Sequence, residues 1–98
     1  MERNSEWKEK HMGKLTLPND AAGWDRLAIA ILKSELKMAD MTYVDLERKL
    51  AGIGVDDHHK NISARIQNGR FTAAFFLQAL VCAGVSELSL PRLPDDQA

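Results

Sequence analysis

The residues best suited to chemistry gather at positions 58–70, in the string HHKNISARIQNGR. This string combines cations, amides and a hydroxyl, and no acidic residue occurs from 58 to 86. Ammonium and guanidinium groups pair with phosphates, while amides form hydrogen bonds with base edges. The string is therefore typical of a surface that binds a polyanion.

We expect a helix at 58–68 to carry this surface. Ile62 and Ile66 are four residues apart and should face inward, so Lys60, Ala64 and Asn68 should point outward. In the major groove, Asn61 and Gln67 could bind adenine, Lys60 or Arg65 could bind guanine or phosphate, and Ala64 could meet a thymine methyl group. The predicted DNA-binding side chains of this helix are Lys60, Asn61, Ser63, Ala64, Arg65, Gln67 and Asn68.

Three further residues beside this helix are predicted to hold phosphates rather than to read bases. They are Thr42 and Tyr43, at the start of the preceding helix, and Arg70, just after the end of the helix at 58–68. Phosphate contacts fix the orientation of a protein on the duplex without reading sequence.

Two earlier helices must position this surface. The first starts after Asn19 or Asp20, carries an apolar stripe that includes Trp24, and ends near 39–40. The second is capped by Thr42, with Asp45 completing a short capping box, and runs to about residue 50 or 51.

The link AGIGVDD should turn the chain into the helix at 58–68. Gly52 and Gly54 break the second helix, and Ile53 and Val55 are expected to pin the turn to the core. Asp56 or Asp57 is expected to cap the next helix, because acidic caps favour its positive N-terminal end.

A fourth helix at 73–83 completes the predicted domain. Gly69 gives the preceding helix a left-handed stop, and Thr72 caps the new one. This helix is apolar nearly all round, so one face can close the core while the other needs a cover. A second subunit is the simplest candidate, which predicts a homodimer.

Other functional classes find little support in the residues. His58 and His59 are adjacent, so their side chains would point about 100° apart on a helix. No residue four positions away and no nearby Cys completes a tetrahedral set of metal ligands with these two residues and His11. We therefore expect no metal. Glu35 and Asp45 have surface or capping explanations, and enzyme motifs are absent. We expect no cofactor and no catalysis.

Composition sets broader bounds. The 98 residues suit one domain with tails, and a net charge of −1 does not by itself suggest a nucleic-acid partner. The single Cys82 excludes an internal disulfide, and the polar N-terminus resembles no signal peptide, so a cytoplasmic location is expected. The apolar run at 75–85 is too short to span a membrane.

The strings TYVDLERKL and NISARIQNGR resemble the lambda-repressor-type (Cro/C1, XRE-like) helix-turn-helix. The residues that fall on that pattern are Thr42, Leu46, Leu50, Ile62, Ser63, Ile66, Gln67 and Gly69. FTAAFFLQALVCAGV is similar to the fourth helix of that family. The resemblance implies an all-α, compact four- or five-helix lambda-repressor-like bundle with extended N- and C-terminal tails. Residues 1–19 would form the arm, 20–86 the helix-turn-helix domain and 87–98 the tail.

The chain also resembles a narrower bacterial group, one of the catalogued domains of unknown function, which brings no activity. Two features depart from the broader family. Glu47 replaces a small Ala, and the link AGIGVDD is several residues longer than the usual turn. Together these departures could tilt the helix at 58–68 away from the usual approach to the groove.

Two functions from different classes follow. The first is a dimeric, sequence-specific regulator of transcription, often a repressor in the broader family, that binds double-stranded DNA. The alternative is a non-catalytic protein-interaction module that kept a repressor-like fold and binds its partner through the apolar fourth helix.

Overall fold

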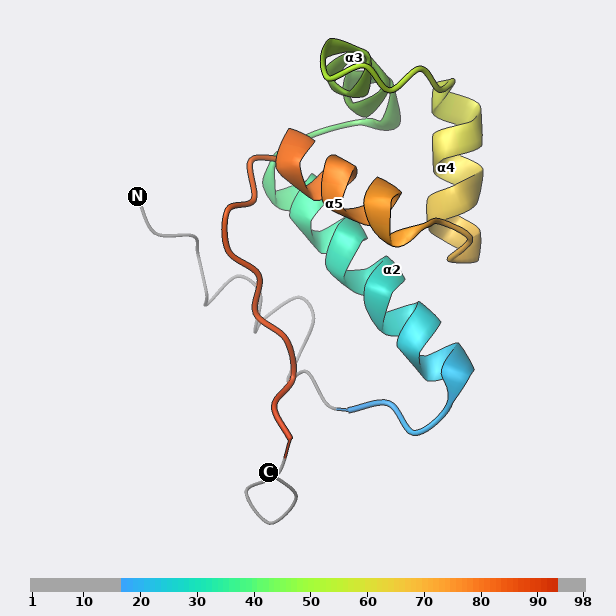
Figure 1. Ribbon diagram of the computed structural model, residues 1–98, viewed down its shortest axis with the longest axis vertical. Coiled ribbons are helices and arrows are strands. Elements are labelled where there is room, and N and C mark those ends of the chain that lie inside the picture. Colours follow the sequence, from blue (N-terminus) through green and yellow to red (C-terminus); the bar gives the residue numbers. More distant parts are fainter. Residues whose placement is uncertain (1–16, 94–98) are drawn as a thin grey trace.

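The computed structural model describes residues 17–93 and shows an all-helical chain (Figure 1). Within this part there are four helices and no strand, which confirms the predicted all-α class. They are α2 (Ala21–Met38), α3 (Tyr43–Gly52), α4 (His59–Asn68) and α5 (Ala73–Cys82). Residues 86–93 form neither helix nor strand. Most of the predicted N-terminal arm, residues 1–16, and the last five residues lie outside the described part.

Helix α2 is the longest element and contacts both α4 and α5. Asp20 caps it as predicted, since its carboxylate accepts the N–H of Gly23 at 2.7 Å. The inward face carries Leu32 at 0% exposure, but it also carries Glu35 at 1%. The surface explanation for Glu35 is therefore wrong. Trp24, expected on the buried stripe, is 51% exposed near the start of the helix.

Helix α3 begins at the predicted capping box. The Thr42 hydroxyl oxygen accepts the N–H of Asp45 at 3.1 Å, and the Asp45 carboxylate accepts the N–H of Thr42 at 3.0 Å. These two bonds satisfy backbone donors that a helix start leaves without partners. Leu46 and Leu50, one turn apart, are fully buried and hold the helix against the core.

The link between α3 and α4 turns at Gly54, whose φ is 84°. The N–H of Val55 then donates to the carbonyl of Leu50 at 2.9 Å, and the Val55 side chain packs against the core. Ile53 does not share this role, because it is 51% exposed. The prediction that both residues pin the turn is thus correct only for Val55.

Helix α4 ends at Gly69, which adopts the left-handed conformation predicted for it, with φ 66°. Gly69 also lies close to α2: a Cβ placed there would come 3.0 Å from Cδ1 of Ile29. Only glycine combines this backbone conformation with so close an approach. Thr72 caps α5 as predicted, since its hydroxyl oxygen accepts the N–H of Phe75 at 3.0 Å.

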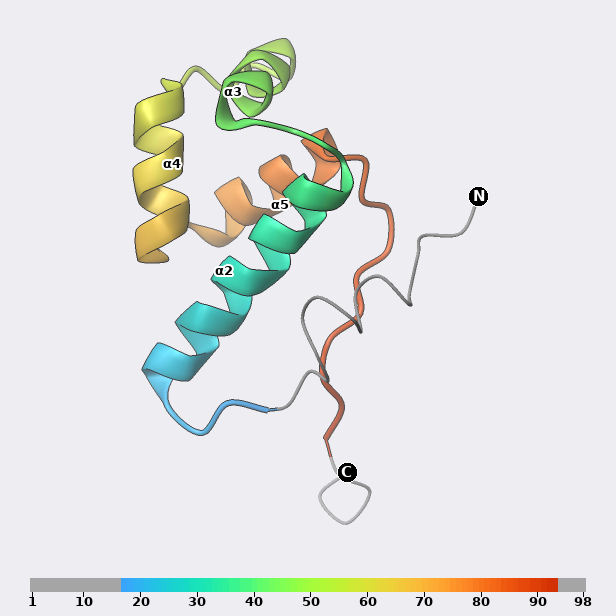
Figure 2. The same cartoon turned by 180° about the vertical axis from the view of Figure 1, so that it is seen from behind.

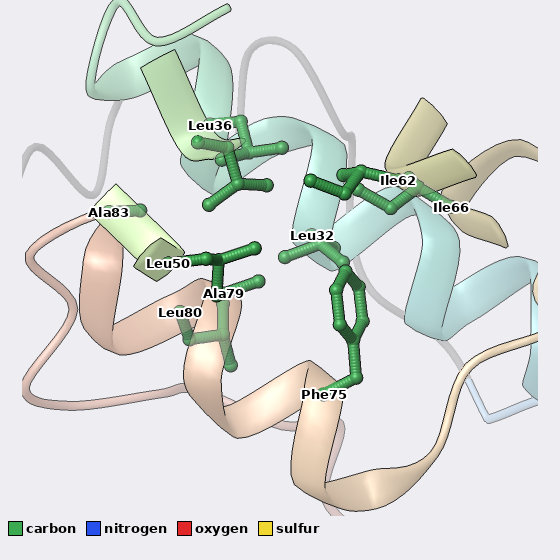
Figure 3. Close-up of a cluster of buried hydrophobic side chains, with 10 residues drawn as sticks. Leu32, Leu36, Leu50, Ile62, Ile66, Phe75, Ala79, Leu80 and Ala83 are labelled. Carbon is green, nitrogen blue, oxygen red and sulfur yellow. The ribbon is translucent and has the colours of Figure 1, made fainter. Parts of the chain in front are cut away.

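All four helices contribute to one hydrophobic core (Figure 3). Aliphatic side chains from α2, α3 and α4 meet the inward face of α5. The buried residues of this core are Leu32, Leu36, Leu46, Leu50, Ile62, Ile66, Phe75, Ala79, Leu80 and Ala83. Helices α3 and α4 cross steeply, and α4 lies at one side of the molecule in both views (Figures 1 and 2).

Helix α5 has two different faces. Phe75, Ala79 and Leu80 are buried, whereas Leu77 and Val81 are 60% and 63% exposed. The prediction that only one face of this helix closes the core is therefore confirmed. No helix in residues 17–93 combines the length and the apolar character needed to cross a bilayer.

Candidate nucleic-acid interface

The outward face of α4 has the composition that the sequence predicted. Ile62 and Ile66 are both 0% exposed, which fixes the rotation of the helix about its axis. The opposite side presents a row of polar, small and cationic side chains to solvent. These exposed residues are Lys60, Asn61, Ala64, Gln67 and Asn68, and Ser63 is partly buried beside them.

Two of these side chains are bonded to each other. Gln67 donates its amide N–H to the hydroxyl oxygen of Ser63 at 2.9 Å, one helical turn away. The bond restricts the rotamers of Gln67, whose side chain is exposed at the helix surface. An amide held in this way loses less entropy when it binds a base edge.

Arg65 has partners within the protein. Its guanidinium lies 2.9 Å from Oδ2 of Asp57, as an ion pair, and 5.5 Å from the ring centre of Phe75. The Asp57 side chain is only 9% exposed, so the pair is shielded on one side from solvent. For Arg65 to contact DNA, it would have to leave both partners. Lys60 is the exposed cation on the outward face of α4.

The start of α4 differs from the prediction. The N-cap is His58, not Asp56 or Asp57, and its Nδ1 accepts the N–H of Lys60 at 3.1 Å. The preceding backbone donor, the N–H of His59, donates to Oε1 of Glu47 at 2.5 Å. Asp57 contributes one step earlier, since its carboxylate accepts the N–H of His58 at 3.0 Å.

Glu47 thus reaches from α3 to the N-terminus of α4. The same Oε1 lies 2.9 Å from Nδ1 of His59. The backbone N–H and then the ring of His59 hold the pKa of Glu47 below its usual value, because both favour the carboxylate over the acid. The first turn of α4 therefore stands beside negative charge, although it also carries the exposed cation Lys60.

The residues predicted to hold phosphates lie at different ends of this surface. Thr42 and Tyr43 begin α3, whereas Arg70 follows the C-terminal end of α4, which points away from α3 in both views (Figures 1 and 2). Arg70 and Thr42 are exposed. Tyr43 packs partly against the core, and this burial raises the pKa of its phenol.

Sequence reasoning missed Glu47 as part of the site. The only signal was its unusual place in the pattern, where the repressor-like families carry a small residue. The contact of Glu47 with His59 joins residues twelve apart in sequence, so no local pattern predicts it.

Comparison with known proteins defines the family. Residues 24–88 match the family described as "Domain of unknown function (DUF6471)". The match covers all of α3, α4 and α5 and most of α2. The chain belongs to this family. The comparison with curated proteins gives no match, and neither does the comparison with solved structures.

Proposed function

We propose that this protein is a small sequence-specific DNA-binding regulator of transcription that places α4 in the major groove. In this proposal α3, the link and α4 act as a helix-turn-helix of the lambda-repressor type. An α-helix fits the major groove of B-DNA, where each base pair presents its own pattern of donors and acceptors.

The observation that carries the proposal is the outward face of α4. Its exposed side chains are one cation, three amides and a methyl group, with no carboxylate among them. A solvated helix without a partner usually mixes acidic and basic side chains on this face. The bond between Gln67 and Ser63 adds an amide with a restricted orientation to this face.

The charge distribution refines how the helix would meet DNA. Glu47 and Asp57 stand at the first turn of α4, where they would repel phosphates. Lys60 lies in this same turn, whereas Gln67 and Asn68 lie in the last turn and Arg70 follows the helix end. We expect the amides of the middle and C-terminal turns to approach the bases, with Lys60 and Arg70 on phosphates at the two ends of the helix.

The proposal includes a homodimer formed through the outer face of α5. Leu77 and Val81 lie one turn apart and expose most of their side chains. Two copies related by a two-fold axis could cover this face with the same face of the partner. A dimer would also place two α4 helices on the half-sites of a palindrome.

Binding of the protein to DNA from upstream of its own gene, measured across a salt series, tests the proposal. Affinity should fall steeply as salt rises, with a slope of about −0.9 on a log–log plot for each phosphate neutralised. A shuffled duplex of the same composition should bind more weakly. Absence of binding at low salt, or equal affinity for both duplexes, would contradict sequence-specific recognition.

The exposed face of α5 also favours a second candidate function. A protein-interaction module would use Leu77 and Val81 to bind an apolar surface of another protein, with α4 as an ordinary solvated helix. In that case the chain would be monomeric alone and would show no salt-dependent affinity for DNA. The same salt series therefore distinguishes the two candidates.

A further inference from the structure

A cluster of metal-ligating side chains lies where α3 meets the start of α4, apart from the outward face of α4. It consists of Glu47, His58 and His59, which each offer a ligand atom, all within 4.8 Å of one another. Glu47 and His59 are partly buried and His58 is exposed, so an ion could reach the cluster from solvent.

The closest pair of ligand atoms is already spaced for a shared ion. Oε1 of Glu47 and Nδ1 of His59 are 2.9 Å apart. Two ligands of a tetrahedral Zn²⁺ with bonds of about 2.0–2.2 Å lie roughly 3.3–3.5 Å from each other. A small outward movement of the His59 ring therefore makes room for an ion between the two atoms.

We propose that Glu47, His58 and His59 form a binding site for one divalent transition-metal ion of the Zn²⁺ type. Two imidazoles and one carboxylate suit Zn²⁺, Co²⁺ or Ni²⁺ better than Mg²⁺ or Ca²⁺, which prefer sites made only of oxygen atoms. Three protein ligands leave the fourth tetrahedral position to water.

The ion takes the place of the proton between Glu47 and His59. If the His59 ring is neutral, its proton moves from Nδ1 to Nε2 as the metal binds Nδ1. If the ring is protonated, the Nδ1 proton is released to solvent instead and Nε2 keeps its own. The backbone N–H of His59 stays bonded to the carboxylate and orients it, as hydrogen bonds around metal ligands commonly do.

His58 contributes by exchanging one contact for another. Its Nδ1 accepts the N–H of Lys60, and its ring stacks on that of His59 with 4.3 Å between their centres. When this ring turns to bind the ion, the metal bond replaces the capping bond. The exposed position of His58 leaves room for that rotation.

The site would link α3 and α4, which otherwise contact each other through side-chain packing and the hydrogen bonds of the Glu47 carboxylate. A metal bound by α3 and by the start of α4 stabilises only the folded chain, because the unfolded chain does not hold these ligands together. The inference is independent of DNA binding and would stand if that proposal failed.

Calorimetric titration of the full chain with Zn²⁺, repeated with Co²⁺ to record its visible absorption, tests the site. We expect one ion per chain and the intense bands of four-coordinate Co²⁺. Glu47→Gln retains an oxygen that can accept the N–H of His59. We expect Glu47→Gln and His59→Ala each to weaken Zn²⁺ binding by at least about tenfold, because even residues that only hydrogen-bond to a metal ligand typically change the affinity by this factor.

Two control variants make the result specific. Asp56→Asn removes a neighbouring exposed carboxylate outside the cluster, and His11→Ala removes the remaining histidine, which lies outside the described residues. Both should bind Zn²⁺ as the wild type does. His58→Gln, at an exposed position, provides a third ligand variant if His59→Ala fails to fold by circular dichroism. Absence of saturable binding, undiminished binding in the folded ligand variants, or loss of binding in His11→Ala would each overturn the proposal.

Discussion

Glu47 bonds to another helix through one oxygen atom. Its Oε1 accepts the N–H of His59 and also contacts the His59 ring, so Glu47 satisfies the first backbone donor of α4 while the N-cap His58 satisfies the second. A negative charge at this place also interacts favourably with the positive end of the α4 dipole. At the start of α3, the Asp45 carboxylate likewise accepts a backbone N–H, that of Thr42, and this hydrogen bond lowers the pKa of Asp45.

These carboxylates predict a dependence of stability on acid pH. The pKa of Glu47 is lowered from 4.5 on folding, so its contribution is fully present above that value and is lost as pH falls through the lower, folded pKa. We expect the urea midpoint to drop as pH falls below about 4.5, and to drop less in Glu47→Gln. Urea unfolding between pH 7 and 3, with a chelator present, measures this difference.

A matched control separates Glu47 from the other acidic groups. Asp56 is exposed and makes no such contact with the start of α4, so Asp56→Asn should retain the full pH dependence of the wild type. Identical pH curves for the wild type and Glu47→Gln would mean that the contact between α3 and α4 adds nothing to stability.

At the level of the elements, the ends of the helices were the most predictable features. Asp20, Thr42, Gly69 and Thr72 each act on a backbone group within a few residues, so their types and spacing were enough to predict them. The same holds for the inward side of α4, because two isoleucines four apart define one face of a helix.

The features that the sequence did not predict depend on distant partners. Glu47 accepts the N–H of His59 from twelve residues away, and His58 rather than Asp56 or Asp57 is the N-cap of α4. Arg65 was a candidate for DNA, but the position of Asp57 and the ring of Phe75 hold it at the protein surface. Local periodicity contains no information on such packing.

The end of α4 gives a prediction at this scale. Gly69→Ala places a side chain in the left-handed region and 3.0 Å from Cδ1 of Ile29. The backbone conformation alone should lower the free energy of unfolding by about 1–2 kcal/mol, and the contact with α2 should add to that. Gly52→Ala is the control, since a Cβ there meets nothing within 4 Å and φ lies outside the left-handed region.

Denaturant unfolding of both glycine variants gives the comparison. Gly52→Ala should be neutral or slightly stabilising, because alanine reduces the entropy of the unfolded chain. If both variants had the same stability as the wild type, the left-handed end of α4 at Gly69 and its close approach to α2 would not contribute to stability as the structure indicates.

At the level of the whole molecule, the proposed dimer depends on the outer face of α5. Leu77→Lys combined with Val81→Lys should convert the dimer to a monomer and leave the helices intact, because both side chains are already exposed. Light scattering measures the mass, and circular dichroism measures the helix content. Val44→Lys is a control, since Val44 is 48% exposed on a different helix. A wild type that is monomeric at high concentration would exclude this use of the face.

The central proposal, that the outward face of α4 binds DNA, is tested most directly by a pair of charge reversals. Lys60→Glu alters an exposed cation on that face, and Lys33→Glu makes the same change at an exposed position on α2. Both should remain folded by circular dichroism. We expect Lys60→Glu to weaken binding to upstream DNA by about tenfold or more and to reduce the salt slope by about 1, whereas Lys33→Glu should change neither. Equal affinities for Lys60→Glu and the wild type, or equal losses in the two variants, would contradict the assignment of α4 as the DNA-binding helix.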